Sequence, residues 1–292
     1  MNELWAIITI NSYYQIISKQ ITKNVLIINN DMLNNYLNKN YIIITFSYNI
    51  NNRLNLLKTE KVILINVDNY NHFKFEKLLT IINKEQLNFT IFDYNPINIK
   101  EINKKYKNIK IEYMPLLYNS YFEEHYNFQI DEHENNKDID ILFYGTSNPR
   151  RELILEKLKK KYNIHIIFIN ITGNSSDKII CNYIKRSKII LNIFFYDYNK
   201  IFDYYRNSYL IANKALLISE YPDNIDFDIE KNLINIDKYL IMDKYENLVD
   251  LVSRYLDNYN NIDINNIIEN QYKWFSNNKL DLLIKNYFTI NY

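Results

Sequence analysis

Short apolar runs alternate with segments of helical spacing along most of the chain. In the first half, the apolar runs predict strands, and the segments between them predict helices because their apolar residues recur every three or four positions. Alternation at this pace is typical of a doubly wound α/β domain with a parallel sheet. The expected strands are Leu4–Ile10, Val25–Ile28, Ile42–Phe46, Val62–Ile65, Phe89–Phe92 and Ile109–Tyr113. The expected helices are Tyr13–Ile21, Met32–Leu37, Phe73–Ile82 and Ile97–Tyr106.

The clearest strand–helix–strand unit of the chain lies in the second half. Lys188–Ile193 and Ala215–Ile218 are apolar runs that predict two buried strands, and residues 201–212 between them have helical spacing. Tight connections of this kind imply that the two strands are parallel. The helical pattern ends at Asn213, and asparagine can adopt the left-handed conformation that ends a helix. We expect a further edge strand at Leu233–Ile236. After it we expect two or three helices, at Tyr245–Leu256, Ile262–Glu269 and Gln271–Phe288.

Polar residues stand where the two strands of this unit end. Asn192 ends the first strand, and Ser219 and Glu220 end the second. Because ligands of parallel sheets bind at the carboxyl ends of strands, we expect these side chains at a ligand site. Arg206 lies on the connection between the strands, where a guanidinium group is suited to bind a phosphate through two hydrogen bonds. The alternative is that Arg206 is a solvated helix residue.

A second candidate for anion binding follows the predicted strand Ile139–Tyr144. Gly145 and Thr146 come directly after this strand and lead into a predicted helix, and the chain has only two glycines. Amide groups at the start of a helix, together with Arg150 and Arg151, are typical of an anion site. The alternative is a capped helix with two solvated arginines, in which Asn148 or Ser147 is the cap.

Composition and charge narrow the classes of function. The 292 residues include 35 Lys and Arg against 34 Asp and Glu, a net charge of +1. A balanced charge argues against nucleic acid as the main partner, because binding to a phosphate backbone needs a basic surface. Four scattered histidines and the single Cys181 argue against a zinc site and exclude an intramolecular disulfide. No apolar run approaches the roughly 20 residues that span a bilayer.

The segment 119–138 differs from the rest of the chain. It is acidic and has no periodicity, which is typical of a linker. We therefore predict a first domain at residues 1–118 and a second at 139–270, followed by a C-terminal helix at 271–292.

The second half resembles the donor-binding domain of GT-B glycosyltransferases, and it is most similar to spore-maturation-type and viral glycosyltransferase-like proteins. The likeness covers about residues 138 to 255. In the first half, Asp93-Tyr94 with Asn98-Ile99 and Met114-Pro115-Leu116 with Tyr118 are similar to the acceptor-side domain of that family. The matching pieces of the second half are Asp140 to Gly145, Asn148 to Arg151, Ser187 to Asn192, Ile201 to Asp203, Arg206 with Tyr209-Leu210, Asn213-Lys214 and Ser219-Glu220.

The resemblance implies an α/β fold with two Rossmann-like domains facing across a cleft, in which the C-terminal helix packs back toward the first domain. It implies metal-independent transfer of a sugar from a nucleotide-sugar donor, a UDP- or GDP-sugar, to a hydroxyl of a glycan, protein or other acceptor. We expect no further cofactor. The balanced charge predicts no nucleic-acid partner, and the lack of a long apolar run predicts no membrane span. The expected place is the cytoplasm, or the host cytoplasm with a role in viral glycosylation if the chain is viral.

The resemblance also assigns roles to residues. It places Gly145, Thr146 and Arg150 or Arg151 near the donor phosphates, and it gives Arg206 the task of neutralising the diphosphate leaving group. It places Glu220 in the donor pocket. The remaining donor-binding residues that it implies are Asn192, Asn213, Lys214 and Ser219. Where many retaining members carry a second glutamate this chain has Ser208, which leaves a non-catalytic nucleotide-sugar-binding or scaffold protein as the alternative function.

Two further points concern acids. An inverting reaction needs a base near the acceptor hydroxyl. Asp93 is a candidate because it ends a predicted strand of the first domain, and the alternative is an acid that caps a helix. The chain has Asp-x-Asp motifs at 138–140 and 226–228. A motif of this type holds a metal in GT-A glycosyltransferases, but it carries little information in a chain with 34 acids. We therefore predict no metal ligand.

Overall fold

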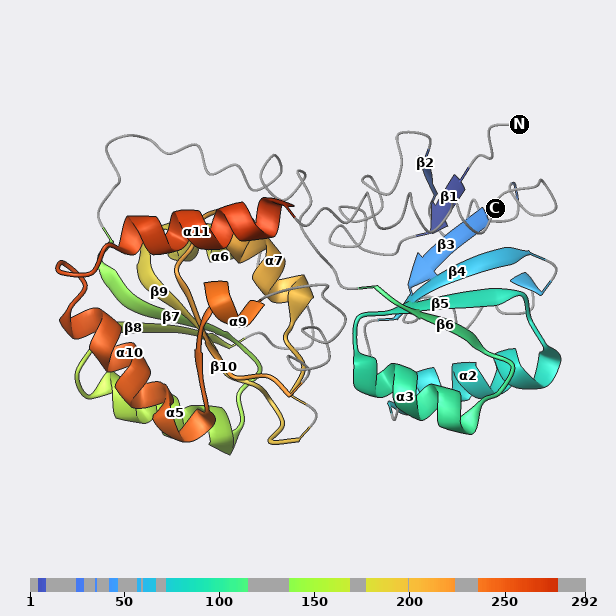
Figure 1. Ribbon diagram of the computed structural model, residues 1–292, viewed down its shortest axis with the longest axis horizontal. Helices are drawn as coiled ribbons and strands as arrows, with labels where there is room; N and C mark the ends of the chain where they lie inside the picture. The colour runs from blue at the N-terminus through green and yellow to red at the C-terminus, as the bar shows by residue number, and fades with distance from the viewer. Residues whose placement is uncertain are drawn as a thin grey trace. The chain divides into compact units, whose positions relative to one another are not determined.

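The computed structural model describes residues 5–8, 25–28, 35, 42–46, 57–58, 60–66, 72–114, 137–168, 177–198, 200–223 and 236–277. These residues fall into two compact units, one within residues 1–116 and one within residues 117–278 (Figure 1). Of the predicted linker, residues 119–136 lie outside the described residues. Residues 278–292 also lie outside them.

The described part of the first unit contains a six-stranded parallel sheet with the order β2-β1-β3-β4-β5-β6. Helices α2 (Phe73–Glu85) and α3 (Pro96–Lys105) lie on the same side of this sheet (Figure 1). The strands are β1 (Trp5–Ile8), β2 (Val25–Ile28), β3 (Ile42–Phe46), β4 (Lys61–Asn66), β5 (Phe89–Asp93) and β6 (Lys110–Tyr113). Each strand overlaps a predicted apolar run. The predicted helices Tyr13–Ile21 and Met32–Leu37 fall almost entirely outside the described residues.

Burial explains why these segments take their form. All residues of β4 except Lys61 are buried, as are all five of β5, which is typical of central parallel strands. Helix α2 buries Phe75, Leu78, Leu79 and Ile82, which share one face because they are spaced by three or four residues.

The second unit contains a five-stranded parallel sheet with the order β11-β10-β9-β7-β8. The strands are β7 (Ile139–Gly145), β8 (Ile164–Phe168), β9 (Ser187–Asn192), β10 (Leu217–Glu220) and β11 (Ile241–Asp243). The helical segments are α5 (Pro149–Lys159), α6 (Asp177–Arg186), α7 (Tyr204–Ala212), α9 (Ile236–Tyr239), η4 (Tyr245–Asn247), α10 (Leu248–Asp257) and α11 (Ile264–Asn277). Figure 1 shows α5 and α10 on one side of the sheet and α6, α7 and α11 on the other, so the unit is doubly wound.

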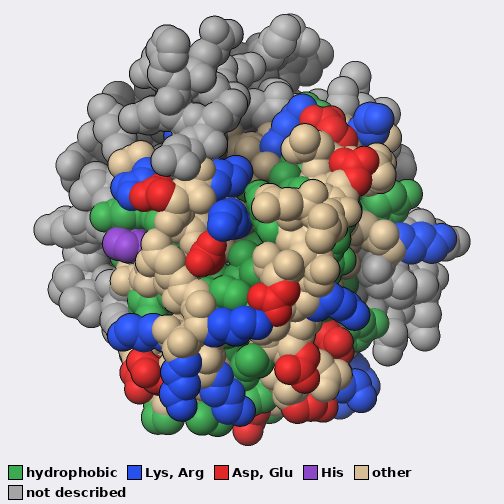
Figure 2. All heavy atoms as spheres, turned by 90° about the vertical axis from the view of Figure 1, so that its left-hand side faces the viewer, with side chains coloured by type: hydrophobic (Ala, Val, Ile, Leu, Met, Phe, Trp, Pro, Cys, Tyr) green, Lys and Arg blue, Asp and Glu red, His purple; other side chains and the backbone are tan. Residues whose placement is uncertain are grey.

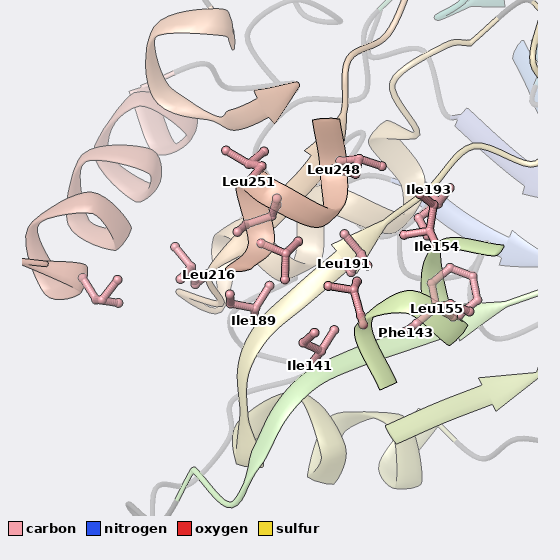
Figure 3. Packing of buried hydrophobic residues seen from close by; sticks show 14 residues of the cluster. Ile141, Phe143, Ile154, Leu155, Ile189, Leu191, Ile193, Leu216, Leu248 and Leu251 are labelled. Carbon is pink, nitrogen blue, oxygen red and sulfur yellow. The ribbon is translucent and has the colours of Figure 1, made fainter. Parts of the chain in front are cut away.

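The core of the second unit lies between its sheet and the helix pair α5 and α10. Figure 3 shows Ile141, Ile189 and Leu191 of the sheet close to Leu155 of α5 and Leu251 of α10. All five are buried, and a fully buried side chain of this kind contributes about 1.5–3 kcal/mol. This packing fixes the start of α5 against the ends of β7 and β9, where the candidate site lies.

Three sequence expectations for the second unit need correction. The residue in the left-handed conformation after α7 is Lys214, with φ of 55°, and not Asn213. The Lys214 and Ala215 amides bond back to Ile211 and Leu210, so the left-handed residue comes one position later than expected, although α7 itself ends at Ala212 as the pattern indicates. Of the expected edge strand Leu233–Ile236, residues 233–235 lie outside the described residues and Ile236 belongs to α9, while the described strand beside β10 at this edge of the sheet is β11. Helix α11 runs without a break through residue 271, where a separate helix is expected.

Candidate functional site

The carboxyl ends of β7, β9, β10 and β11 lie along one edge of the second sheet, because all its strands are parallel. Each strand brings a different part of the chain to this edge. These parts are the segment 145–151 at the end of β7 and after it, Phe194, Phe195 and Lys200 after β9, Glu220 at the end of β10, and Tyr245 after β11. We call this set of residues the carboxyl edge.

Glu220 and Arg150 form a buried ion pair at the carboxyl edge. Glu220 has 0% exposure and the Arg150 side chain has 18%. Arg150 Nη1 donates to Glu220 Oε2 at 2.8 Å, and Nη2 donates to Oε1. The backbone N–H of Phe194 also donates to Glu220 Oε2, at 3.1 Å. A buried carboxylate needs such partners, because an uncompensated charge is costly away from water.

Tyr245 covers one face of the same arginine. The Arg150 guanidinium carbon lies 4.0 Å from the centre of the Tyr245 ring, a cation–π contact. The Tyr245 hydroxyl donates to the backbone oxygen of Arg150 at 2.6 Å. Burial raises the pKa of this hydroxyl, and the charge of Arg150 opposes that rise. Tyr245 therefore restrains both the backbone and the side chain of Arg150.

Three side chains at the start of α5 hold the backbone that follows β9. Asn148 Nδ2 donates to the oxygen of Phe195 at 2.5 Å, and Arg150 Nη1 donates to that of Phe194 at 3.0 Å. Arg151 Nε donates to the oxygen of Ile193 at 2.9 Å. Asn148 also caps α5 by accepting from the Arg151 N–H, so it is the predicted cap, in preference to Ser147. The connection after β9 is thus fixed to the connection after β7.

Arg151 differs from its neighbour because it points into the protein. It is 5% exposed, and its Nη1 donates to the oxygen of Thr146 at 2.7 Å. Its guanidinium carbon lies 5.5 Å and 5.3 Å from the ring centres of Phe143 and Phe195. This geometry assigns Arg151 to bracing the edge. The alternative of a capped helix with two solvated arginines is wrong, since neither side chain is exposed.

Lys200 is a second cation of the carboxyl edge, and no sequence pattern singles it out. Its Nζ lies 3.8 Å from Glu220 Oε1 and 3.4 Å from Asp223 Oδ1. Its backbone exchanges hydrogen bonds with Asp223 through both the N–H and the oxygen. Lysine is common throughout this chain, so its position alone carries no signal.

The structure brings together the residues that were expected at the strand ends. Asn192 Nδ2 donates to Ser219 Oγ at 2.9 Å, and the Ser219 hydroxyl donates to the oxygen of Glu220 at 2.8 Å. Both Asn192 and Ser219 are buried. Gly145 ends β7 with φ of 152°, a conformation that favours glycine.

Two other expected residues lie elsewhere. Asn213 and Lys214 precede β10, at the opposite end of this strand from Glu220. Lys214 Nζ pairs with Glu269 at 2.6 Å and lies 4.9 Å from the ring centre of Tyr272. Arg206 is the third residue of α7, but its side chain lies outside the described part of the chain.

The connection after β9 also carries exposed aromatic rings. Tyr196 and Tyr198 are 45% and 54% exposed, and their ring centres are 5.1 Å apart. Phe195 meets Tyr196 edge to face at 4.8 Å. Tyr196 and Tyr198 follow directly after the segment 193–195 that α5 holds, so their rings offer an exposed aromatic surface next to the charged groups.

Asp93 lies in the first unit, at the end of β5. It is 1% exposed, and its carboxylate accepts from Asn66 Nδ2 at 2.6 Å, Asn98 Nδ2 at 3.0 Å and the Asn95 N–H at 2.7 Å. Asn95, and not Asp93, caps α3, with Pro96 in the first turn as predicted. The Asp93 carboxylate is thus the centre of a buried hydrogen-bond network.

The first Asp-x-Asp motif is taken up by ion pairs. Arg186 binds Asp138 and thereby lowers the pKa of that carboxyl, and Lys188 Nζ lies 2.7 Å from Asp140. The second motif, at 226–228, lies outside the described residues. Within the described ranges, no group of three or more His, Cys, Asp and Glu side chains is placed to hold a metal ion. No helix in those ranges is long and apolar enough to cross a membrane.

Charged side chains of both signs are interspersed over the face shown in Figure 2. Exposed ion pairs of the second unit include that of Lys161 with Asp257, at 2.6 Å. The balance of signs on this face matches the net charge of +1.

No protein-family model matches the chain. Over 232 residues it is 28% identical to an uncharacterized protein of Acanthamoeba polyphaga mimivirus, which covers 79% of this chain and 73% of the relative.

Two solved structures are similar to this chain. One is a DNA-modifying β-glucosyltransferase, determined in the presence and absence of its substrate uridine diphosphoglucose. The TM-score is 0.57 at 16% identity, and the match covers 97% of this chain and 98% of that one. The other is a spinosyn rhamnosyltransferase complexed with thymidine diphosphate, with a TM-score of 0.46 at 8% identity over 97% and 99% of the two chains. The first likeness, together with the two parallel sheets, confirms the predicted α/β fold of the GT-B glycosyltransferase type.

Proposed function

We propose that this protein is a glycosyltransferase that moves a sugar from a nucleotide-sugar donor, a UDP- or GDP-sugar, to an acceptor hydroxyl. One observation carries the proposal. A chain with the fold of a glycosyltransferase holds an arginine, Arg150, in a fixed orientation at the carboxyl ends of the parallel strands of its second unit. Ligands of such sheets bind at this edge.

The reaction needs positive charge at this place. The acceptor oxygen forms a bond to the anomeric carbon, and the bond from that carbon to the diphosphate oxygen breaks. Its electron pair stays on the nucleoside diphosphate, and the proton of the acceptor hydroxyl passes to a base or to water. We propose that Arg150 and Lys200, which lie beside Glu220 at the carboxyl edge, stabilise the charge that develops on the leaving group.

Arg206 is a further candidate for the same role. It lies in the first turn of α7, which follows the connection that leaves the carboxyl end of β9. Because α7 leads back to the start of β10, its first turn belongs to the carboxyl end of the sheet. We propose that Arg206 assists Arg150 at the diphosphate.

The other parts of the donor fit the same edge. The rings of Tyr196 and Tyr198 are exposed, and aromatic rings of this kind can stack on a nucleobase or on a sugar. The acceptor is a glycan, a protein or another molecule with a free hydroxyl.

Donor turnover tests the proposal. A panel of UDP- and GDP-sugars should include at least one donor from which the chain releases nucleoside diphosphate. Arg150→Lys should lower kcat/KM for that donor by about 10-fold or more, because a point charge cannot replace a planar fork. Arg254→Lys is the matched control, since Arg254 is exposed on α10, and it should leave kcat/KM unchanged. A parent chain that turns over no donor in the panel would contradict the proposed enzyme.

The same assay tests metal independence. We propose that cationic side chains, and not a metal ion, stabilise the leaving group. Release of nucleoside diphosphate should therefore persist in EDTA at the same rate. If EDTA abolishes it and manganese restores it, this part of the proposal is wrong.

A second candidate function is binding of a nucleotide sugar without turnover. The occupied carboxylate of Asp93 and the presence of Ser208 in place of an acid favour it. This candidate predicts that a nucleotide sugar raises the melting temperature of the chain while no nucleoside diphosphate is released.

A further inference from the structure

Arg150 is restrained on three sides. Glu220 meets the end of the guanidinium group through Nη1 and Nη2, and the backbone oxygen of Phe194 accepts the other hydrogen of Nη1. The ring of Tyr245 covers one face at 4.0 Å. An arginine side chain has many rotamers, and these contacts select one of them before any ligand arrives.

The remaining hydrogen-bonding capacity of Arg150 is on one edge. Glu220 and Phe194 use three of the five N–H groups that an arginine carries. Within the described part of the chain, the N–H of Nε and the outer N–H of Nη2 have no partner. These two donors are parallel, and their spacing matches two oxygens of a phosphate.

Glu220 itself has little capacity left for a ligand. Its carboxylate is fully buried and accepts from Arg150 Nη1, Arg150 Nη2 and the Phe194 N–H, with Lys200 close by. A glutamate that contacts ribose or sugar hydroxyls needs an exposed oxygen. The Glu220 carboxylate is therefore directed at Arg150 and not at a ligand.

We propose that Glu220 and Tyr245 are positioning residues, which fix Arg150 so that its Nε–Nη2 edge receives the diphosphate of the donor. The proposal rests on the proposed function and makes it more specific. It replaces the role that the family resemblance gives to Glu220, contact with the donor, by one in which Glu220 acts through Arg150.

Binding of inorganic pyrophosphate separates the two roles of Glu220, because pyrophosphate has the oxygens of a diphosphate but no ribose, base or sugar. Glu220→Gln should weaken pyrophosphate binding by about 10-fold or more, since glutamine offers one acceptor oxygen where three N–H groups now meet a carboxylate. Arg150→Lys should cause a similar loss. Adding Glu220→Gln to Arg150→Lys should cause no further loss, because the effect of Glu220 passes through Arg150.

Tyr245 gives a test that leaves the ion pair unchanged. Tyr245→Phe keeps the ring over Arg150 and should bind pyrophosphate nearly as well as the parent, whereas Tyr245→Leu should weaken binding severalfold. The matched control is Glu246→Gln, an exposed acid next to Tyr245, which should change nothing. Each variant is measured by isothermal titration calorimetry on the full chain after its melting temperature has been compared with that of the parent. If Glu220→Gln does not fold, the comparison of Tyr245→Phe with Tyr245→Leu still tests whether the positioning of Arg150 controls pyrophosphate binding.

The contrary results are distinct. If Glu220→Gln leaves pyrophosphate binding unchanged or strengthens it, while it weakens uridine diphosphate, Glu220 contacts the ribose and the positioning role is wrong. If Arg150→Lys does not weaken pyrophosphate binding in a chain that binds uridine diphosphate, the proposed contact between the Nε–Nη2 edge of Arg150 and the diphosphate is wrong. The chain would then still have a donor site. A parent chain that binds neither pyrophosphate nor any nucleoside diphosphate would overturn the proposed function and this inference with it.

Discussion

At the scale of residues, Arg150 and Arg151 show how far a sequence can lead. Both stand in the first turn of α5, and either one fits an anion site on sequence alone. The structure separates them, because Arg151 bonds to the backbone oxygens of Thr146 and Ile193 while Arg150 pairs with Glu220. These partners are supplied by tertiary structure up to 70 residues away, so local patterns contain no information about them.

Asp93 allows a prediction at the same scale. Its carboxylate accepts three N–H donors within the first unit, so we expect it to stabilise the fold rather than to act as a base. Asp93→Asn should lower the free energy of unfolding by about 2–4 kcal/mol, because an amide can accept at only one oxygen and leaves buried donors unpaired. Urea denaturation measures this change.

The control for Asp93→Asn is Asp250→Asn on α10, where the aspartate is exposed. This change should cost no more than about 1 kcal/mol. An Asp93→Asn chain that unfolds like the parent but has lost sugar transfer would show that Asp93 is the base after all.

At the scale of elements, the caps at two helix starts were predictable, and the left-handed residue after α7 was not. Asn95 with Pro96 and Asn148 with Pro149 begin α3 and α5 as the sequence indicates, because capping depends on neighbouring residues. The end of α7 depends on Lys214, which adopts φ of 55° although lysine has no preference for it. The chain has too few glycines to mark such positions.

Substitution of Lys214 tests this helix end. Lys214→Gly should be more stable than Lys214→Ala by about 1 kcal/mol, because only the alanine keeps a Cβ in the left-handed region. Both variants lose the ion pair with Glu269, so their difference isolates the backbone conformation. Thermal and urea unfolding measure it. A Lys214→Ala chain as stable as Lys214→Gly would show that this residue is not left-handed in solution.

At the scale of the whole molecule, alternation of apolar runs and helical segments was enough to predict α/β units with parallel sheets. It did not predict the strand orders, β2-β1-β3-β4-β5-β6 and β11-β10-β9-β7-β8, because pairing between strands depends on contacts distant in sequence. The alternation also predicted that ligand-binding residues lie at strand ends. It could not predict that Lys200 and Tyr245 lie beside Glu220 and Arg150, since these contacts join segments distant in sequence.

The central claim is that a nucleotide-sugar donor binds at the carboxyl edge of the second unit. Hydrogen–deuterium exchange of the full chain, with and without a saturating nucleoside diphosphate, tests it most directly. We predict that amide exchange slows by about 10-fold or more in residues 145–151 and 193–195, which carry the start of α5 and the connection held by it. Slowed exchange confined to other segments, with these two unchanged, would contradict the account.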